Sequence, residues 1–345
     1  MNILDLVRPH LLNIKPYSSA RDEFEGDASV FIDANENPYG SVTGDPFNRY
    51  PDPHFRASRK KLAEIKNTGP ENIFLSNGSD EAVDLLIRLF CEPKLDQIII
   101  SPPTFSMYEA SAAINDVFIS KVPLNESFQL QPDEILRKKE AKILFICSPN
   151  NPTGNQMKME DIIFLLENFP NIIVVDEAYA DFIGEKSMLD LINKYPHLLV
   201  MQTFSKAWGM AGLRVGMLFG HPEIIRMLCK IKMPYNINSY SQDQVLNALE
   251  KTTEKEEIVK RILKNKEYLH RHLIASRAIL KVFPSDANFF LVHVANPHHL
   301  YDYLLHNGII VRNVSKHIPG TLRITVGTEH ENQLLVDKLS QYIPS

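Results

Sequence analysis

The chain has 345 residues, of which 44% are hydrophobic, which is enough for about two domains with buried cores. Its formal net charge of −5 argues against a basic surface that binds nucleic acid. The three cysteines form no CxxC pair, and no apolar stretch approaches the ~20 residues of a membrane span, so a cytoplasmic globular protein without disulfides or a metal site is expected.

The N-terminal region predicts an arm followed by an irregular loop. Residues 1–40 carry charges among short apolar runs, and we expect them to form an arm that contributes to the smaller of two domains. Residues 35–53 (NENPYGSVTGDPFNRYPDP) are rich in proline and glycine, which favours an ordered loop over a helix.

Residues 41–240 predict a large α/β domain. Helix-like stretches separate short apolar runs that are rich in β-branched residues, and this pattern predicts a mostly parallel sheet with helices on both faces. The candidate strands are 72–76, 97–101, 117–122, 142–147, 172–176, 198–203 and 214–219, and the candidate helices are 79–90, 105–113, 158–168 and 222–230. Ligands of such sheets bind beyond the carboxyl ends of the strands, so the residues there are candidate site residues.

Residues 241–345 predict a second, smaller α+β domain. A long charged helical region, 241–275, precedes the strand-like runs NFFLVHV, GIIVR and LRITV. Two further helices are expected, one near 298–307 and one that begins at 329.

Polar residues follow two of the candidate strands in turn-like sequences. After the first strand, Gly78 permits a tight turn, and Ser79 or Asp80 can cap the next helix, whose free N–H groups suit an anion. The run SPNNPTG at 148–154 places Asn151 at another strand end. Taken alone, the first feature is typical of an ordinary helix cap, and the second is also consistent with an ordinary structural turn.

Two charged residues end the next two strands. Asp176 directly ends an apolar strand, where burial of a carboxylate is costly unless a cation, a cap or a metal accompanies it. Lys206 lies in the glycine-containing run TFSKAWGMAGLRVG, followed eight positions later by Arg214. We expect Lys206 to be buried, because a desolvated lysine near other cations loses its proton more readily and can attack an aldehyde.

Together these strand ends suit one cofactor. An aspartate that faces a pyridine nitrogen keeps the ring protonated and therefore electron-withdrawing. Tyr179 and Asn151 can bond the phenolic oxygen of the ring, and Ser205 with Arg214 can bind a phosphate. This set of functional groups predicts pyridoxal 5′-phosphate.

Several motifs resemble those of a known enzyme family. DEAY, TFSKAWGMAGLR and NNPTG resemble the signatures of the fold-type-I, aspartate-aminotransferase-like pyridoxal phosphate enzymes. DANENPYG, RYPDP, NGSDEAVDLLIRLFCEP, PPTFSMY and LRITVGT are similar to the histidinol-phosphate aminotransferase branch of that superfamily. The resemblance runs in order along nearly the whole chain.

The resemblance implies a role for each matching residue. Lys206 would bind the cofactor aldehyde as a Schiff base and then carry the proton from Cα to C4′ of the cofactor, with Asp176 and Tyr179 as the other catalytic residues. The implied cofactor-binding residues are Gly78, Ser79, Asp80, Tyr108, Asn151, Asp176, Tyr179, Ser205, Lys206, Arg214 and Tyr50. Within this set, Tyr108 would stack on the ring and Tyr50 would reach the phosphate in the partner subunit of a homodimer. The implied substrate-binding residues are Arg323, Arg312, Tyr17 and Asn37.

The implied reaction is amino transfer between histidinol phosphate and 2-oxoglutarate in histidine biosynthesis, giving imidazole acetol phosphate and glutamate. Three alternatives stay open on the same fold. One is an aromatic amino acid aminotransferase, and another is a decarboxylase of the phosphothreonine type, because the outcome depends on which Cα bond lies perpendicular to the ring. The third is a non-catalytic sensor, which the negative charge and the absence of an appended DNA-binding segment disfavour.

Overall fold

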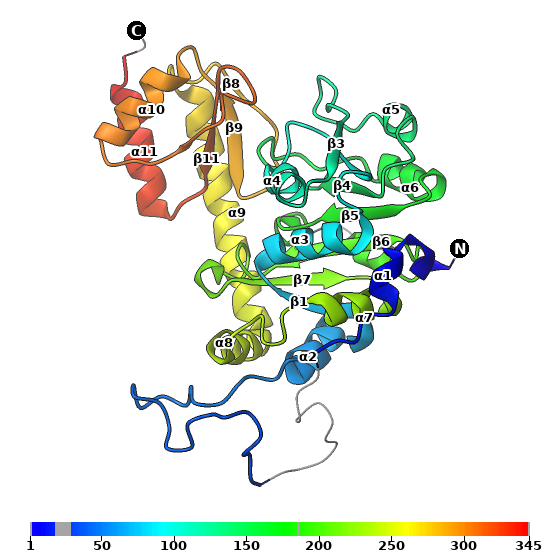
Figure 1. The fold of residues 1–345 in the computed structure, drawn as a ribbon. Helices are drawn as coiled ribbons and strands as arrows, with labels where there is room; N and C mark the ends of the chain where they lie inside the picture. Colours follow the sequence, from blue (N-terminus) through cyan, green and yellow to red (C-terminus); the bar gives the residue numbers. More distant parts are fainter. Residues whose placement is uncertain (1, 18–28, 185–186, 344–345) are drawn as a thin grey trace.

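The computed structural model describes residues 2–17, 29–184 and 187–343, so part of the expected arm, 18–28, lies outside the described residues. A large central sheet with helices on both faces forms the body, and a smaller sheet lies at the far end of a long helix (Figure 1). The large sheet has seven strands in the order β1-β7-β6-β5-β4-β2-β3, and the small sheet has four in the order β10-β11-β9-β8. The predicted fold class is confirmed.

The strands of the large sheet are short and apolar. They are β1 (Ile73–Asn77), β2 (Gln97–Ile100), β3 (Phe118–Lys121), β4 (Ile143–Cys147), β5 (Ile172–Asp176), β6 (Leu198–Thr203) and β7 (Val215–Phe219). Every residue of β4 to β7 is buried, because helices cover both faces and no side chain of these strands meets solvent. This burial explains why these strands read as continuous apolar runs.

Strand β7 departs from the parallel arrangement of its neighbours. It runs antiparallel to both β6 and β1, whereas β2 to β6 pair in parallel. Gly216 lies opposite Thr203 of β6, and Asn77 of β1 lies opposite Val215. The start of β7 therefore lies at the same sheet edge as the carboxyl ends of β1, β4, β5 and β6.

The helices around the large sheet are amphipathic. They are α2 (Arg56–Lys66), α3 (Gly78–Phe90), α4 (Met107–Ile114), α5 (Pro132–Leu136), α6 (Met159–Asn168) and α7 (Pro222–Ile231). In α3, Val83, Leu86 and Phe90 follow at spacings of three and four and are buried, while Arg88 is on the outer side and pairs with Asp84. We had expected Ser79 or Asp80 to cap α3, but the helix already begins at Gly78, so both lie in its first turn.

The small sheet is antiparallel throughout. Its strands are β8 (Lys281–Val282), β9 (Phe289–His293), β10 (Arg312–Asn313) and β11 (Thr321–Thr325), packed with α9 (Thr252–Ala275), α10 (Pro297–His306) and α11 (Glu329–Gln341). The run GIIVR was predicted as a strand, but only its last residue, Arg312, pairs in the sheet. Of the helices in the described ranges, none combines the length and apolar character needed to span a membrane.

Two expected features of the domain layout are wrong in detail. The helical region 241–275 is two helices, α8 (Ser239–Leu249) and α9, and α8 packs on α2 through the buried Val245 and Leu249 in the core of the large sheet. The first residues pack on the large sheet as well, since Ile3 and Val7 share a core with α3 and α7. Their apolar side chains are buried there, and Arg8 pairs with Glu92 at 2.9 Å, so this part does not join the small sheet. The division at residues 40 and 240 otherwise stays a prediction.

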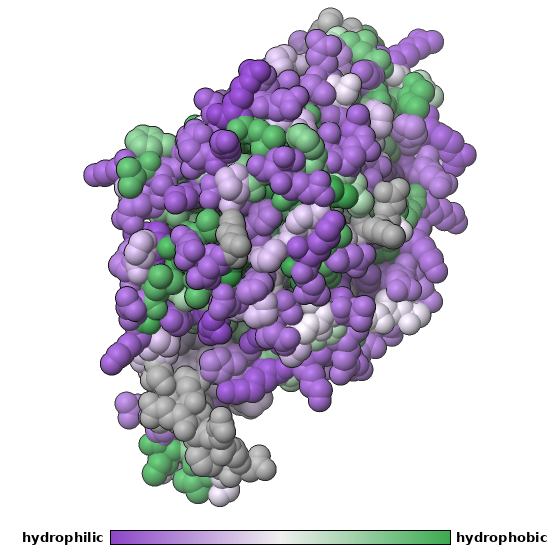
Figure 2. All heavy atoms as spheres, turned by 90° about the vertical axis from the view of Figure 1, so that its right-hand side faces the viewer, coloured by the Kyte–Doolittle hydropathy of each residue, from purple (hydrophilic) through white to green (hydrophobic). Residues whose placement is uncertain are grey.

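The segment before α2 projects from the body (Figure 1). Val30, Ile32, Tyr39 and Val42 on this segment are almost fully exposed, between 70% and 102%. Figure 2 shows a mainly hydrophilic body with hydrophobic residues gathered at the end of this projection. The projection therefore carries apolar surface that the rest of the described chain does not cover.

Candidate active site

A cavity of about 540 Å³ opens at the sheet edge where β4, β5 and β6 end, between this edge and strands β10 and β11 of the small sheet. Many of the predicted site residues line it: Ser79, Asp80, Asn151, Asp176, Tyr179, Ser205, Lys206, Arg214, Arg312 and Arg323. The sequence reasoning missed other lining residues, among them Thr104, Phe105, Cys147, Thr203, Asn313, Lys316 and His317. Thr104 and Phe105 follow strand β2, so the rule that sites follow strand ends could have found them.

Asp176 forms part of the cavity wall. Its side chain is almost fully buried, with Oδ2 accepting a hydrogen bond from the Tyr108 hydroxyl at 2.7 Å and Oδ1 accepting one from the Ala178 N–H at 3.1 Å. Burial raises the pKa of this carboxyl group, and the two hydrogen bonds oppose that rise because they favour the charged form. A carboxylate in this position can accept a further N–H from a ligand in the cavity.

Lys206 follows β6 and faces the same cavity. The expectation of a buried lysine is wrong, because the side chain is exposed to the open cavity rather than packed in the core. The surrounding atoms still desolvate the amine enough to lower its pKa, and the nearby Arg323 lowers the pKa further. Its ammonium lies 5.5 Å from the centre of the Tyr179 ring, and it forms no hydrogen bond or ion pair with the described residues.

Arg323 and Asn151 approach each other across the cavity. Arg323 Nη1 donates a hydrogen bond to Asn151 Oδ1, which leaves the amide N–H groups of Asn151 free to donate toward a ligand oxygen. Arg323 also lies over the ring of Phe289 at 5.3 Å, and its Nε is buried without a hydrogen-bond partner. A buried guanidinium N–H without a partner indicates a site that an anion completes.

The other end of the cavity has the features of a phosphate site. Arg214 Nη2 lies 3.2 Å from Asp80, and it packs so closely on Gly78 that a Cβ there would lie 2.6 Å from Nη2. Ser79 and Ser205 complete this end, beside the N-terminus of α3 with its free N–H groups. Arg214 itself adopts a left-handed backbone conformation (φ 55°), which is uncommon for an arginine. Residues in such conformations are concentrated at functional sites.

The face opposite β6 is strongly basic. Arg312, Lys316 and His317 line the cavity from β10 and the turn that follows it. Ser315 donates a side-chain hydrogen bond to Asn313, which closes this turn locally. With Arg323, these side chains give the substrate side of the cavity several groups that suit anions.

Tyr108 does not occupy the position that the resemblance implied. Its side chain is completely buried and does not line the cavity, so it cannot stack on a ligand there. Its ring stacks instead on Phe145, with centroids 4.7 Å apart and planes inclined by 10°. Phe105, three residues earlier, lines the cavity and supplies the aromatic wall.

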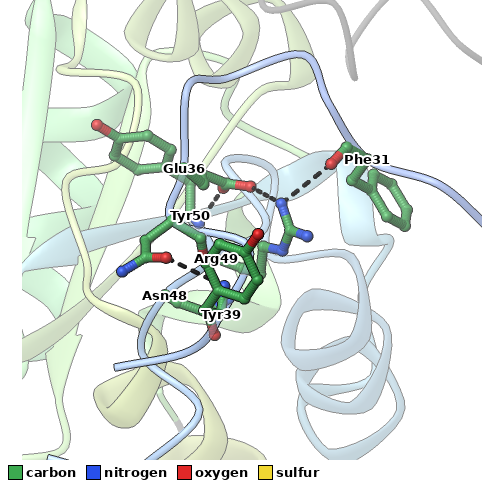
Figure 3. A network of polar contacts seen from close by, with 7 residues as sticks. Phe31, Glu36, Tyr39, Asn48, Arg49 and Tyr50 are labelled. Carbon is green, nitrogen blue, oxygen red and sulfur yellow. Dashed lines mark hydrogen bonds and ion pairs between the residues drawn. The ribbon is translucent and has the colours of Figure 1, made fainter. Parts of the chain in front are cut away.

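Tyr50, Asn37 and Tyr17 do not line the cavity of their own chain. Tyr50 stacks on Tyr235 at 4.5 Å, and its backbone N–H donates to Glu36, which also pairs with Arg49 at 2.7 Å (Figure 3). Asn37 accepts a hydrogen bond from the Tyr39 N–H within the same projecting segment. Tyr17 is 69% exposed. The fold of a single chain thus leaves these residues outside the site.

The cavity fits pyridoxal phosphate. A buried carboxylate with spare acceptor capacity, an amine with lowered pKa and a helix N-terminus with Arg214 beside it all face the cavity. These are the groups that the ring nitrogen, the aldehyde and the phosphate of this cofactor require. The unpartnered Arg323 Nε leaves a separate position for a substrate anion.

Known proteins resemble this chain over nearly its whole length. The family model described as aminotransferase class I and II matches residues 24–339. The chain belongs to this family. It is 50% identical over 341 residues to the histidinol-phosphate aminotransferase of Cytophaga hutchinsonii, covering 98% of each chain. It is 46% identical over 342 residues to the protein of the same name from Parabacteroides distasonis, again covering 98% of each. The family predicted from the motifs is confirmed.

Two solved structures share the architecture of this chain. The crystal structure of histidinol-phosphate aminotransferase from Clostridium acetobutylicum has a TM-score of 0.79 and 26% identity, with 86% of this chain and 90% of that chain covered. L-threonine-O-3-phosphate decarboxylase from Porphyromonas gingivalis has a TM-score of 0.74 with 22% identity, covering 86% and 90%. At that identity the second likeness concerns the fold alone.

Proposed function

We propose that this aminotransferase exchanges an amino group between histidinol phosphate and 2-oxoglutarate, with pyridoxal phosphate as its cofactor, as one step of histidine biosynthesis. The observation that carries the proposal is the shared cavity, where Lys206 and Asp176 face one ligand space between two anion-binding ends. The relatives named above, which match this chain over nearly its whole length, support the substrate.

Cofactor binding uses the residues at the carboxyl edge of the sheet. Asp176 would hold the ring nitrogen, Tyr179 and Asn151 would donate to the phenolic oxygen, and Phe105 would cover the ring face. Ser205, Arg214 and the backbone at Gly78, Ser79 and Asp80 would hold the phosphate. Once bound, the cofactor supplies an electron-withdrawing ring that lowers the pKa of the substrate Cα–H.

Lys206 moves the proton in this scheme. Its lowered pKa leaves a larger fraction of the amine neutral at a given pH, and only the neutral amine can attack a carbonyl or accept a proton. With the cofactor and a substrate bound, Lys206 would be the group that accepts the proton from the substrate Cα and then donates it again. Tyr179, whose pKa is raised by burial, stays protonated and continues to donate its hydrogen bond.

Substrate anions bind on the basic face. Arg323, with its unpartnered Nε, would bind a carboxylate or a phosphate by donating two N–H groups to it, and Arg312 would assist. Both half-reactions can use the same two arginines, since one substrate carries a phosphate and the other a second carboxylate. Tyr17 and Asn37 are proposed to complete this side when the arm closes over the substrate.

We infer that the working unit is a homodimer whose subunits share active sites. Tyr50 does not reach the cavity of its own chain, and the projecting segment that precedes it exposes apolar side chains. A second copy of the chain would cover this apolar surface, and the same surface on both copies would form an isologous interface. Tyr50 of each chain would then reach the cofactor phosphate in the other chain.

A coupled assay tests the proposed reaction. Purified protein with pyridoxal phosphate, offered histidinol phosphate and 2-oxoglutarate, should form glutamate, and Lys206→Ala should lower kcat by about 10³-fold or more. Lys264→Ala, in the outward part of α9, is the matched lysine control and should retain activity. Release of carbon dioxide from phosphothreonine, or faster turnover of phenylalanine than of histidinol phosphate, would contradict the proposed substrate.

A further inference from the structure

Tyr108 is held rigidly behind the wall of the cavity. It lies in the first turn of α4 and is completely buried. Phe145 of β4 stacks on its ring, and Phe105 contacts it edge to face with centroids 5.6 Å apart. Two aromatic neighbours from different segments thus fix the ring and, with it, the position of the hydroxyl group.

The hydroxyl group points at Asp176. Tyr108 Oη donates to Oδ2 at 2.7 Å, and the only other side-chain hydrogen bond that Asp176 accepts from the described residues comes from the Ala178 N–H. No cation within the described part of the chain forms an ion pair with this buried carboxylate. Hydrogen bonds to charged acceptors are stronger than those to neutral ones, so Tyr108 supplies a large share of the stabilisation that this carboxylate receives from the protein.

The same contact favours the ionised form of Asp176. Burial and the neighbouring carboxylate raise the pKa of Tyr108 well above its usual range, so the phenol stays protonated and acts as a donor. Donation to the carboxylate lowers the pKa of Asp176, against the effect of burial. The other titratable groups that interact with Asp176 are Asp80, Lys206, Cys147 and Tyr179. Cys147 stays a neutral thiol, because burial raises its pKa.

We propose that Tyr108 is a positioning residue that holds Asp176 ionised and correctly oriented toward the ring nitrogen of the cofactor. The inference rests on the proposed function, because only a bound pyridine ring gives Asp176 a partner in the cavity. Tyr108 touches neither cofactor nor substrate, and its effect on the reaction passes through Asp176. Tyr108 also contacts Phe105, the aromatic residue that lines the cavity.

The test is the Tyr108→Phe variant, which keeps the ring and both aromatic contacts and removes only the hydroxyl group. We expect kcat to fall about tenfold, the equivalent of one lost interaction of ~1.4 kcal/mol, with KM for histidinol phosphate unchanged within twofold. The ¹⁵N NMR shift of bound pyridoxal phosphate labelled at the ring nitrogen should move toward the unprotonated form. Tyr195→Phe is the matched control, since it removes a buried hydroxyl that bonds Glu167 at 3.0 Å away from the cavity.

A double variant separates positioning from general structural support. In an Asp176→Asn background, Tyr108→Phe should cause no further loss of cofactor affinity or of the residual rate, because its target is already altered. Additive losses, or a Tyr108→Phe protein with the kcat and the ¹⁵N shift of the unaltered protein, would overturn the inference. Lack of turnover by the unaltered protein would instead refute the proposed function, and the ¹⁵N shift would still report on Tyr108.

Discussion

Lys206 and Arg323 are two basic side chains that face one cavity. Because like charges repel, the positive charge of Arg323 disfavours the protonated form of Lys206. Desolvation by the surrounding atoms lowers the pKa of both groups, and the charge of Arg323 lowers the pKa of Lys206 further. In the proposed function the arginine would therefore have two roles, because it would bind a substrate anion and it also favours the neutral form of the lysine, which is the nucleophilic form. Neither effect requires contact between the two side chains.

This coupling predicts a shift in pH dependence. Removing the arginine charge in Arg323→Gln should raise the pKa of Lys206, so that its neutral amine becomes available only at higher pH. The measurement is the rate of covalent pyridoxal phosphate binding to cofactor-free protein, followed by absorbance as a function of pH. The midpoint of this pH profile should lie at a higher pH in Arg323→Gln than in the unaltered protein. Arg277→Gln, an exposed arginine beyond α9, should leave the midpoint unchanged. A midpoint that stays put or falls in Arg323→Gln would contradict the coupling.

At the scale of elements, the site depends on how strand ends align. Parallel pairing sets Cys147 level with Asp176, so β4 and β5 finish together, and it sets Asp176 level with Met201, so β6 continues past them to Thr203. The antiparallel β7 begins where these strands end, and it brings Arg214 beside the first residue of α3. The phosphate end of the cavity is thus assembled from a helix N-terminus and the start of a strand.

Gly78 is the residue on which this assembly depends. Its φ of 72° disfavours side chains, and a Cβ would displace the Arg214 guanidinium. We expect Gly78→Ala to weaken the affinity for pyridoxal phosphate about tenfold, the effect of ~1.4 kcal/mol of strain and lost phosphate contact. Gly212→Ala is a close control, since a Cβ there meets no atom within 4 Å. Fluorescence titration of cofactor-free protein measures both, and equal affinities for the two variants would refute the prediction.

At the scale of the whole molecule, the projecting segment is the part that a single chain leaves unexplained. It carries Tyr50 and Asn37 away from the cavity of its own chain and exposes apolar residues at its end (Figure 2). Exposed apolar side chains lower the free energy when a partner covers them, so this segment favours self-association.

Shared sites make a prediction about mixed dimers. Lys206→Ala and Tyr50→Ala proteins, each weakly active at limiting pyridoxal phosphate, should regain about a quarter of full activity when unfolded and refolded together in equal amounts, because half of the dimers then contain one intact site. Co-refolding Lys206→Ala with an Arg323→Ala protein should restore none, since both residues line the cavity of the same chain. Sedimentation analysis should show dimers in each sample. A mixture that stays at the average of its two components would argue against Tyr50 crossing to the partner.

Much of the fold could be predicted from the sequence, because buried parallel strands must be apolar throughout and their helices must be amphipathic. Each of the seven predicted strands overlaps one strand of the large sheet. The break between α8 and α9 at Glu250 and Lys251 was missed, since two charged residues continue a helical pattern as readily as they interrupt it. Two-residue strands such as β8 were missed too, because so short a segment has no periodicity.

Sequence reasoning predicted the candidate residues Lys206, Asp176, Asn151 and Arg214, because they stand next to strand ends, where a reactive or charged side chain has no packing role. How these residues meet depends on the folded chain. The tertiary structure showed Phe105, and not Tyr108, at the cavity, because Tyr108 is packed on Phe145 of β4 while Phe105, which precedes α4, lines the cavity. It also left Lys206 exposed to an open cavity, since exposure depends on distant segments that local sequence does not encode.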